Sequence, residues 1–249
     1  MVCRAVCIVR VLILVQVVLL TGACIDLGPG MGSNTEQNMR DDMELKPGGR
    51  IMLPAPETTG KISVEEALFT RRSVRTYTKE PVTPDDLSRL LWAAQGVTAG
   101  AGGRNELRTA PSAGALYPLE VYVVAGNVGG VSDGVYHYRS REHALQKVCD
   151  GDRRRNLSGC ALHQSQITDA AVDIVFTAVF ERTTARYGDR GVRYVYMEAG
   201  HAAQNVYLQA ETLDLGVCAV GAFCDADVAT LLALPDDEVP IYILSIGSV

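Results

Sequence analysis

Three polar side chains in the first third of the sequence could bind a phosphate group. Arg71, Ser73 and Arg75 occupy alternate positions, so in an extended segment their side chains point to the same side. Two guanidinium groups and a hydroxyl that converge on one point suit a phosphate, because guanidinium groups donate paired hydrogen bonds to oxyanions. The alternative is that arginines at a helix C-terminus complement the helix dipole and stay solvated. The residues alone leave both interpretations open.

Two further segments could bring the backbone close to a flat ligand. Residues 111–118 are mostly small, and the prolines at both ends hold the loop in place. Residues 220–223, Val-Gly-Ala-Phe, follow an apolar segment, and their N–H groups could also face a ligand. Each segment alone is a weak signal.

Other candidates for chemistry are less informative. The glycines within residues 100–103 follow a predicted helix rather than a strand, so they do not form a dinucleotide-binding fingerprint. No cysteine or histidine spacing is typical of a metal site, and we expect no metal. The three arginines at 153–155 are interpreted as a solvated helix face.

The hydrophobic pattern predicts one mixed α+β domain. Ser63 and Glu66 form a capping box that predicts a helix to about residue 70, and Thr83 with Pro84 begins a second helix that ends at Gly96. The longest predicted helix covers residues 192–215, before Gly216, and a short one begins near residues 225–227. The predicted strands are 119–123, 134–138, 171–180, 217–220 and 241–246. Helices and strands interleave without regular alternation, which favours the α+β class.

The first 23 residues are typical of an export signal. They hold no acidic residue, carry Arg4 and Arg10, and contain an apolar stretch shorter than the roughly 20 residues that span a bilayer. Residues 21–24 resemble a bacterial lipoprotein cleavage site. Cys24 would then carry the lipid, and the protein would lie on the periplasmic or cell-surface side. The alternatives are an uncleaved signal anchor or a start codon at Met31 or Met39, and a later start would leave the protein in the cytoplasm.

The composition fits a globular body on a tether. The chain has 249 residues, of which 47% are hydrophobic and 21% charged. Residues 25–60 lack an apolar period and are predicted to form a flexible tether, which leaves 61–249 as the folded domain. Without the two leader arginines the net charge of −6 becomes −8, which argues against nucleic-acid binding.

The order of these segments resembles the nitroreductase-like flavoproteins, and within them the SagB-type dehydrogenases. The resemblance covers about residues 53–247 and rests on five segments: 81–83, 112–120, 198–205, 220–223 and 234–235. It implies a nitroreductase-like α+β fold with a mixed, mostly antiparallel sheet packed by helices. It also implies a homodimer with FMN at the interface between the subunits.

The resemblance also implies which residues hold FMN. The segment 71–75 would bind the phosphate and ribityl chain, the loop 111–115 would lie along the isoalloxazine, and residues 221–222 would place an N–H near N5. The chain lacks the basic residue that many relatives have near the C-terminus, so more of the phosphate contact would fall on the arginines of 71–75. The implied cofactor-binding residues are Arg71, Arg72, Ser73, Arg75, Pro111, Ser112, Ala113, Gly114, Ala115, Gly221 and Ala222.

Two departures from the family pattern bear on catalysis. Ala115 stands where nitroreductases proper usually have Asn, which favours the SagB-type branch. That branch often has a Lys-Tyr pair before the long helix, proposed to move protons, and here the pair is Arg186-Tyr187. Arginine stays protonated and is a poor general base, whereas Tyr187 could act as an acid or hydrogen-bond donor. Both residues are catalytic candidates, and the alternative is that they are ordinary loop residues.

The sequence therefore predicts an FMN-dependent oxidoreductase. Hydride would pass through flavin N5 to or from a small quinone, nitroaromatic or heterocycle, with NAD(P)H as a candidate electron donor. One alternative is a non-catalytic surface lipoprotein that binds flavin or another ligand. Another is an azoline dehydrogenase of peptide tailoring, which the arginine at 186 and a lipid anchor disfavour.

Overall fold

The computed structural model describes residues 49–101, 103 and 106–249. The predicted leader, Cys24 and residues 25–48 of the predicted tether lie outside these described residues. Within the described part, no helix is long and apolar enough to cross a membrane, and no cluster of His, Cys, Asp and Glu could hold a metal ion.

A seven-stranded sheet forms the centre of the domain, with the strand order β1-β6-β5-β4-β7-β9-β8. Its strands are β1 (Arg50–Met52), β4 (Leu119–Ala125), β5 (Gly134–Arg139), β6 (Ala144–Asp150), β7 (Val172–Ala178), β8 (Leu215–Val220) and β9 (Val239–Ser248). All pairings between these strands are antiparallel, and a parallel bridge from Ser73 to Val217 extends the β8 edge. The sheet is therefore mixed and mostly antiparallel, as predicted. A separate short pair joins β2 (Val97–Ala99) to β3 (Leu107–Arg108).

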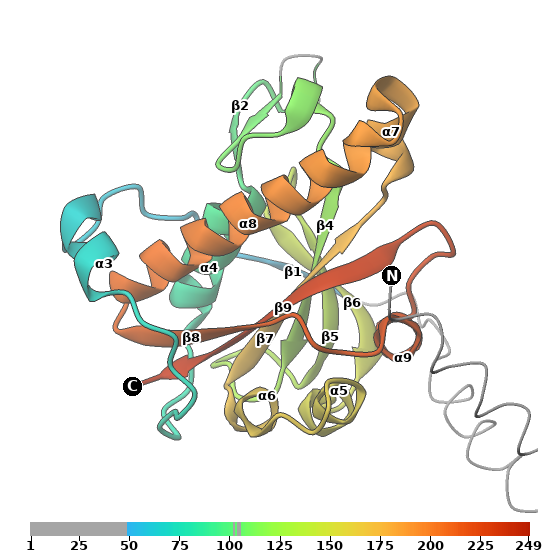
Figure 1. Cartoon of the computed structure of the whole chain (residues 1–249). Coiled ribbons are helices and arrows are strands. Elements are labelled where there is room, and N and C mark those ends of the chain that lie inside the picture. The colour runs from blue at the N-terminus through green and yellow to red at the C-terminus, as the bar shows by residue number, and fades with distance from the viewer. Residues whose placement is uncertain (1–48, 102, 104–105) are drawn as a thin grey trace, which may run out of the picture. The chain divides into compact units, whose positions relative to one another are not determined.

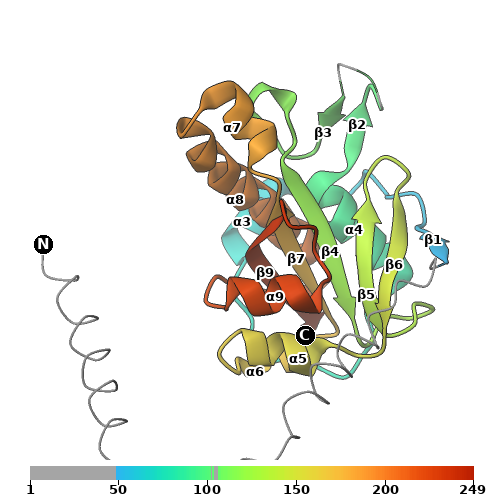
Figure 2. The same cartoon turned by 90° about the vertical axis from the view of Figure 1, so that its right-hand side faces the viewer.

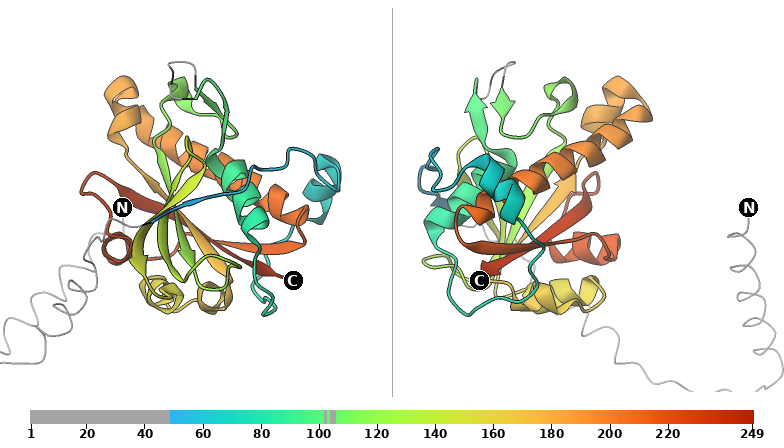
Figure 3. Two further views of the ribbon diagram at one scale, coloured as in Figure 1. Left: turned by 180° about the vertical axis from the view of Figure 1, so that it is seen from behind. Right: turned by 60° about the vertical axis from the view of Figure 1, so that its left-hand side comes forward.

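Helices cover both faces of this sheet (Figures 1 and 2). They are α3 (Val64–Thr70), α4 (Pro84–Gln95), α5 (Arg154–Cys160), α6 (Ser165–Asp169), α7 (Glu181–Tyr187), α8 (Arg190–Glu211) and α9 (Asp225–Leu231), with a short 3-10 helix η1 (Ala113–Ala115). Helices α4 and α8 pack on one face, and α5, α6 and α9 pack on the other. Helix α3 lies against α8 (Figure 3).

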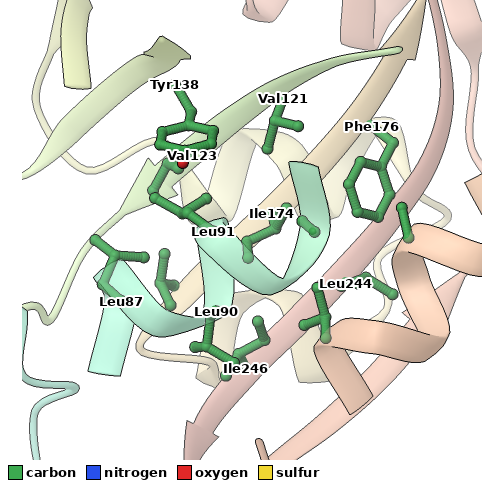
Figure 4. Close-up of a cluster of buried hydrophobic side chains, with 14 of the residues drawn as sticks. Leu87, Leu90, Leu91, Val121, Val123, Tyr138, Ile174, Phe176, Leu244 and Ile246 are labelled. Carbon is green, nitrogen blue, oxygen red and sulfur yellow. The ribbon is translucent and has the colours of Figure 1, made fainter. Parts of the chain in front are cut away.

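Along the central strands, successive side chains point to opposite faces of the sheet, and this produces two hydrophobic cores. Val121 and Val123 of β4 face α4 and α8, and Val124 faces the helices on the other side. Figure 4 shows the first core, where Leu87 and Leu90 of α4 contact the sheet. Strand β7 is buried along its whole length, which explains its nearly continuous apolar sequence.

The predicted helix starts are confirmed by their caps. The Ser63 Oγ accepts a hydrogen bond from the Glu66 N–H at 3.1 Å, and Thr83 Oγ1 accepts one from the Asp86 N–H at 3.1 Å. The predicted end of the long helix is wrong. It ends at Glu211, and a turn in which Asp214 takes a positive φ of 56° leads the chain into β8 at Leu215.

Two other predictions need correction. The folded domain begins before residue 61, because Arg50–Met52 pairs with β6 and Leu53 is buried, so this part of the predicted tether belongs to the body. The arginines at 153–155 do not form a uniformly solvated face. Arg154 is largely buried, where it pairs with Asp152 and donates hydrogen bonds to the carbonyls of Gly126 and Ala170. The sequence does not predict short polar segments such as β6 and α6, because their hydrophobic periodicity is too weak.

Candidate active site

The segment 71–75 is extended, as its phosphate-binding interpretation requires. Ser73 bridges to Val217 of β8, and the Val74 N–H donates to the Val217 carbonyl at 2.9 Å. Tyr207 of α8 then contacts two of the alternating side chains. Its hydroxyl is 3.3 Å from Ser73 Oγ, and the Arg71 guanidinium lies 5.3 Å from its ring centroid. The structure thus brings Arg71 and Ser73 together on one side of the segment.

The arginines of this segment divide into two kinds. Arg72 Nη1 donates to the carbonyls of Phe69, Thr70 and Arg71 at 2.7–3.1 Å, so it caps the C-terminus of α3. This is the helix-terminal role that the alternative interpretation described. Arg71 and Arg75 form no ion pair or hydrogen bond through their guanidinium groups with the described residues. These two charges are therefore available to an anion.

Residues 221 and 222 follow directly on β8, the strand that Ser73 joins. Within the described part of the chain, their backbone N–H groups donate no hydrogen bond, and both residues are exposed. A Cβ on Gly221 would meet no atom within 4 Å, so the backbone there is open to a ligand. Gln164 Nε2 donates to the Ala222 carbonyl at 3.1 Å and holds the turn in place. At about 3.3 Å per residue, this turn lies roughly 13 Å along the strand from Val217.

The loop 111–115 meets the Arg186-Tyr187 pair. Gly114 has a φ of +65°, and a Cβ there would lie 2.7 Å from Tyr187 Oη and 2.9 Å from Arg186 Nη1. Glycine is therefore needed both for the backbone conformation and for this close approach. Ser112 Oγ accepts a hydrogen bond from the Tyr117 N–H at 2.9 Å, which closes the loop. The structure thus joins two segments that the sequence singled out separately.

Beneath this loop lies a buried carboxyl that sequence reasoning missed as a site residue. Glu198 of α8 is 2% exposed, and its Oε1 has no hydrogen-bond partner among the described residues. Burial raises the pKa of Glu198 to about 7, although the neighbouring Ser112 and Gln95 side chains and the positive charge of Arg108 oppose the shift. In the sequence, the signal for this residue was a glutamate that falls within the apolar helix face formed by Val195, Ala199 and Ala202.

The expected cofactor residues form two groups on opposite sides of α8. The first group contacts Tyr207, and the second lies over Glu198 and beside α7, which precedes α8. Nine residues separate Glu198 from Tyr207, so at about 100° and 1.5 Å per residue they point in opposite directions and lie roughly 13 Å apart along the axis. A single chain therefore does not bring both groups around one small ligand.

Comparison with known proteins identifies the family of the chain. The model of the Nitroreductase family matches residues 68–248. A protein named as a nitroreductase, MJ1384 of Methanocaldococcus jannaschii, is 44% identical over 209 residues, which are 84% of this chain and 98% of the relative. The microcin B17-processing protein McbC of Escherichia coli is 31% identical over 150 residues, 57% of this chain and 54% of McbC.

A solved structure shows the same fold at similar identity. The crystal structure of a protein described as a nitroreductase from Ralstonia eutropha superposes with a TM-score of 0.69 at 30% identity, covering 82% of this chain and 93% of that one. The fold and the sequence together define a flavin oxidoreductase. The chain belongs to the nitroreductase family.

Proposed function

We propose that the protein is an FMN-dependent oxidoreductase that transfers hydride through flavin N5 to or from a small quinone, nitroaromatic or heterocycle. NAD(P)H is the proposed electron donor. The proposal rests on one observation: the candidate phosphate-binding and ring-binding residues belong to one continuous part of the structure. Arg71 and Arg75, both without ion-pair partners in the described chain, are joined through Ser73 to the strand whose end carries the free N–H groups of residues 221 and 222.

The residues present fit an elongated anionic cofactor. The two guanidinium groups supply charge for a phosphate, and the Ser73 hydroxyl adds a hydrogen-bond donor or acceptor. Farther along β8, the absence of any atom within 4 Å of a Gly221 Cβ leaves room for a flat ring against the backbone. A phosphate at one end and a ring at the other match the two ends of FMN.

The chain's own groups have separable tasks in this reaction. FMN, when bound, supplies the two-electron redox chemistry. Arg71 and Arg75 would bind and orient its phosphate, and the N–H groups of residues 221 and 222 would donate to polar atoms of its ring. Tyr187 would donate a proton to, or hold, an oxygen or nitrogen of the substrate. Arg186 stays charged, so it can donate hydrogen bonds but cannot accept a proton, which disfavours azoline oxidation by a basic side chain at this position.

We further propose that the enzyme is a homodimer whose sites combine residues of both subunits. The two groups of cofactor residues lie on opposite sides of α8, so a second copy is needed to complete one site. Large apolar side chains are exposed together on the N-terminal part of α8, with Tyr196 55%, Met197 52% and Val192 39% exposed. Exposed apolar side chains gathered on one region are typical of an interaction surface.

Spectroscopy of the purified full-length protein tests the function. We expect the absorbance bands of oxidised flavin, and anaerobic titration with NADH or NADPH should bleach them. Protein that lacks flavin and does not bind added FMN would contradict the proposal and favour a non-catalytic ligand-binding protein. If flavin is bound but neither nucleotide reduces it, the proposed FMN site would stand and NAD(P)H would be rejected as the electron donor.

Sedimentation tests the dimer. Met197→Asp places a charge on the proposed interface and should give a monomer with weaker FMN binding. The matched variant Leu162→Asp alters an exposed apolar side chain elsewhere on the surface and should leave the dimer intact. A wild-type monomer that binds FMN fully would contradict the shared site.

We also propose, from the sequence of residues 1–24, that the protein is exported and anchored by a lipid on Cys24. Mass spectrometry of the native N-terminus tests this directly. A diacylglyceryl group on Cys24 would support export, whereas an N-terminus at Met1 or Met31 would contradict it.

A further inference from the structure

A polar cavity lies outside the proposed cofactor segments 71–75 and 221–222. Its volume is about 550 Å³, and its lining residues come from the start of β4, the turn between β5 and β6, and β3. Figure 2 shows these parts of the chain near one another in its upper part. Of the described residues, five arginines line it: Arg50, Arg108, Arg139, Arg141 and Arg182. Of the proposed cofactor residues only Ala115 reaches its wall, and the segments 71–75 and 221–222 do not. The cavity therefore borders the loop 111–115, and the segments 71–75 and 221–222 take no part in it.

Two of the three carboxylates that line this cavity, Glu106 and Glu120, are paired with basic side chains. Glu106, 4% exposed, binds Arg108 at 2.9 Å and Arg141 at 2.7 Å. Glu120 binds Arg182 at 2.7 Å and His137 at 2.8 Å. These two carboxylates fix the positions of several basic side chains. The third, Glu142, forms no ion pair with the described residues, so the five arginines and three glutamates of the wall leave an excess of two positive charges.

The pKa of Glu120 supports this charge distribution. Burial raises it, but the hydrogen bond with His137 and the positive charge of Arg182 outweigh burial and hold the pKa at about 2. Glu120 is therefore ionised throughout the physiological range and keeps Arg182 in place.

Two of the arginines remain available to a ligand. The guanidinium groups of Arg50 and Arg139 take part in no ion pair or hydrogen bond within the described part of the chain. Arg50 lies opposite Gln146, and Gln146 lies opposite His137, so Arg50 is on the same face of the sheet as His137. Arg139, two residues from His137, shares that face. From the strand spacings, their Cα atoms lie about 12 Å apart, so both side chains can reach one ligand.

We propose that this cavity binds a small organic anion with two or more negatively charged oxygens, such as a polycarboxylate or a phosphate ester, through Arg50 and Arg139. The volume is typical of small-molecule sites and far larger than an inorganic ion requires. Leu116 and Tyr117 add apolar surface for a carbon skeleton. In a protein of net charge −6, anion binding requires such a local concentration of arginines.

Calorimetric titration of the full-length protein, saturated with FMN, tests the site. Citrate and glycerol 3-phosphate serve as probes for carboxylate and phosphate chemistry, at constant ionic strength set with chloride. We expect saturable binding of at least one probe with one site per chain. Arg50→Gln and Arg139→Gln should each weaken it about tenfold or more, because a charge-assisted hydrogen bond contributes on the order of 1.5–3 kcal/mol.

Two matched variants locate the bound anion. Arg155→Gln removes an exposed arginine outside the cavity, and Arg75→Gln removes one from the proposed cofactor segment. Both should bind the probe as the wild type does. Absence of saturable binding would overturn the proposal, as would equal weakening in Arg155→Gln. Loss in Arg75→Gln with full binding in Arg139→Gln would place the anion at the cofactor segment instead. If the protein binds no FMN, the same titration on the flavin-free chain still tests this cavity.

Discussion

The two groups of proposed cofactor residues differ in what holds them in place. The segment 71–75 lies at the surface, where a backbone bridge to β8 fixes it and its two charged ends remain free. The loop 111–115 instead packs over a buried carboxyl and depends on a residue with positive φ. Charge can therefore be removed from the first group with little effect on folding. Changes around the second group should alter stability and its pH dependence.

Removal of both free arginines of the first group should have the largest effect. In Arg71→Gln/Arg75→Gln we expect FMN affinity to fall on the order of 10³-fold, because two charge-assisted contacts to the phosphate are lost. The free energy of unfolding of the flavin-free protein should change by less than about 1 kcal/mol, since Arg71 contributes only a surface contact with Tyr207. Fluorescence titration with FMN and urea unfolding measure the two quantities. Unchanged affinity would contradict the phosphate assignment.

Glu198 should instead affect the free energy of unfolding, and this effect should depend on pH. Its pKa is about 7 in the folded state against 4.5 as an ordinary value, so the neutral acid is favoured by folding. Its contribution to stability is fully present below about pH 4.5 and is lost as the pH rises through 7. At 1.36 kcal/mol per pKa unit, the loss is about 3 kcal/mol.

The side chain in Glu198→Gln is neutral at every pH, so this variant separates the titration of Glu198 from that of the other acidic residues. The stability of the variant relative to the wild type should therefore increase by up to about 3 kcal/mol between pH 4.5 and pH 8. Urea unfolding of both proteins across this range measures the difference. A difference that stays constant with pH would show that Glu198 does not titrate as its burial implies.

Gly114→Ala tests the contact between the loop and the Arg186-Tyr187 pair. The positive φ alone should cost about 1–2 kcal/mol, and the new methyl group must displace the Tyr187 hydroxyl. We expect a lower melting temperature together with slower flavin reduction. The matched variant Gly159→Ala lies in α5 with no atom closer than 4.0 Å and should be neutral or slightly stabilising. Equal behaviour of the two variants would contradict the close packing at Gly114.

The smallest effects should come from the two serines. Ser112→Ala should lower the free energy of unfolding by about 1 kcal/mol, because its Oγ accepts the Tyr117 N–H in a half-buried loop. Ser73→Ala should change it less, since that hydroxyl is exposed and its contact with Tyr207 is 3.3 Å long. Urea unfolding at one pH compares the pair. The reverse order would mean that the first group, not the second, is coupled to folding.

Local signals explain which parts of the fold could be predicted. The caps at Ser63 and Thr83 and the apolar run that became β7 act within a few residues of the chain, so the sequence reports them directly. Strand β6 was missed because its residues 144–150 alternate poorly. Arg154 was misjudged because its partners, Asp152 and the carbonyls of Gly126 and Ala170, come partly from distant segments.

For the candidate site, the sequence by itself determined the residue types. It supplied an alternating arginine and serine segment, a small-residue loop, a tyrosine beside an arginine, and two small residues after a strand. The tertiary structure alone decided which of these meet. It directed Arg72 to the helix carbonyls and left Arg71 and Arg75 free, and it brought Tyr187 to Gly114. The physical reason is that α8 and β8 set these positions through packing between segments far apart in sequence, which no local pattern encodes.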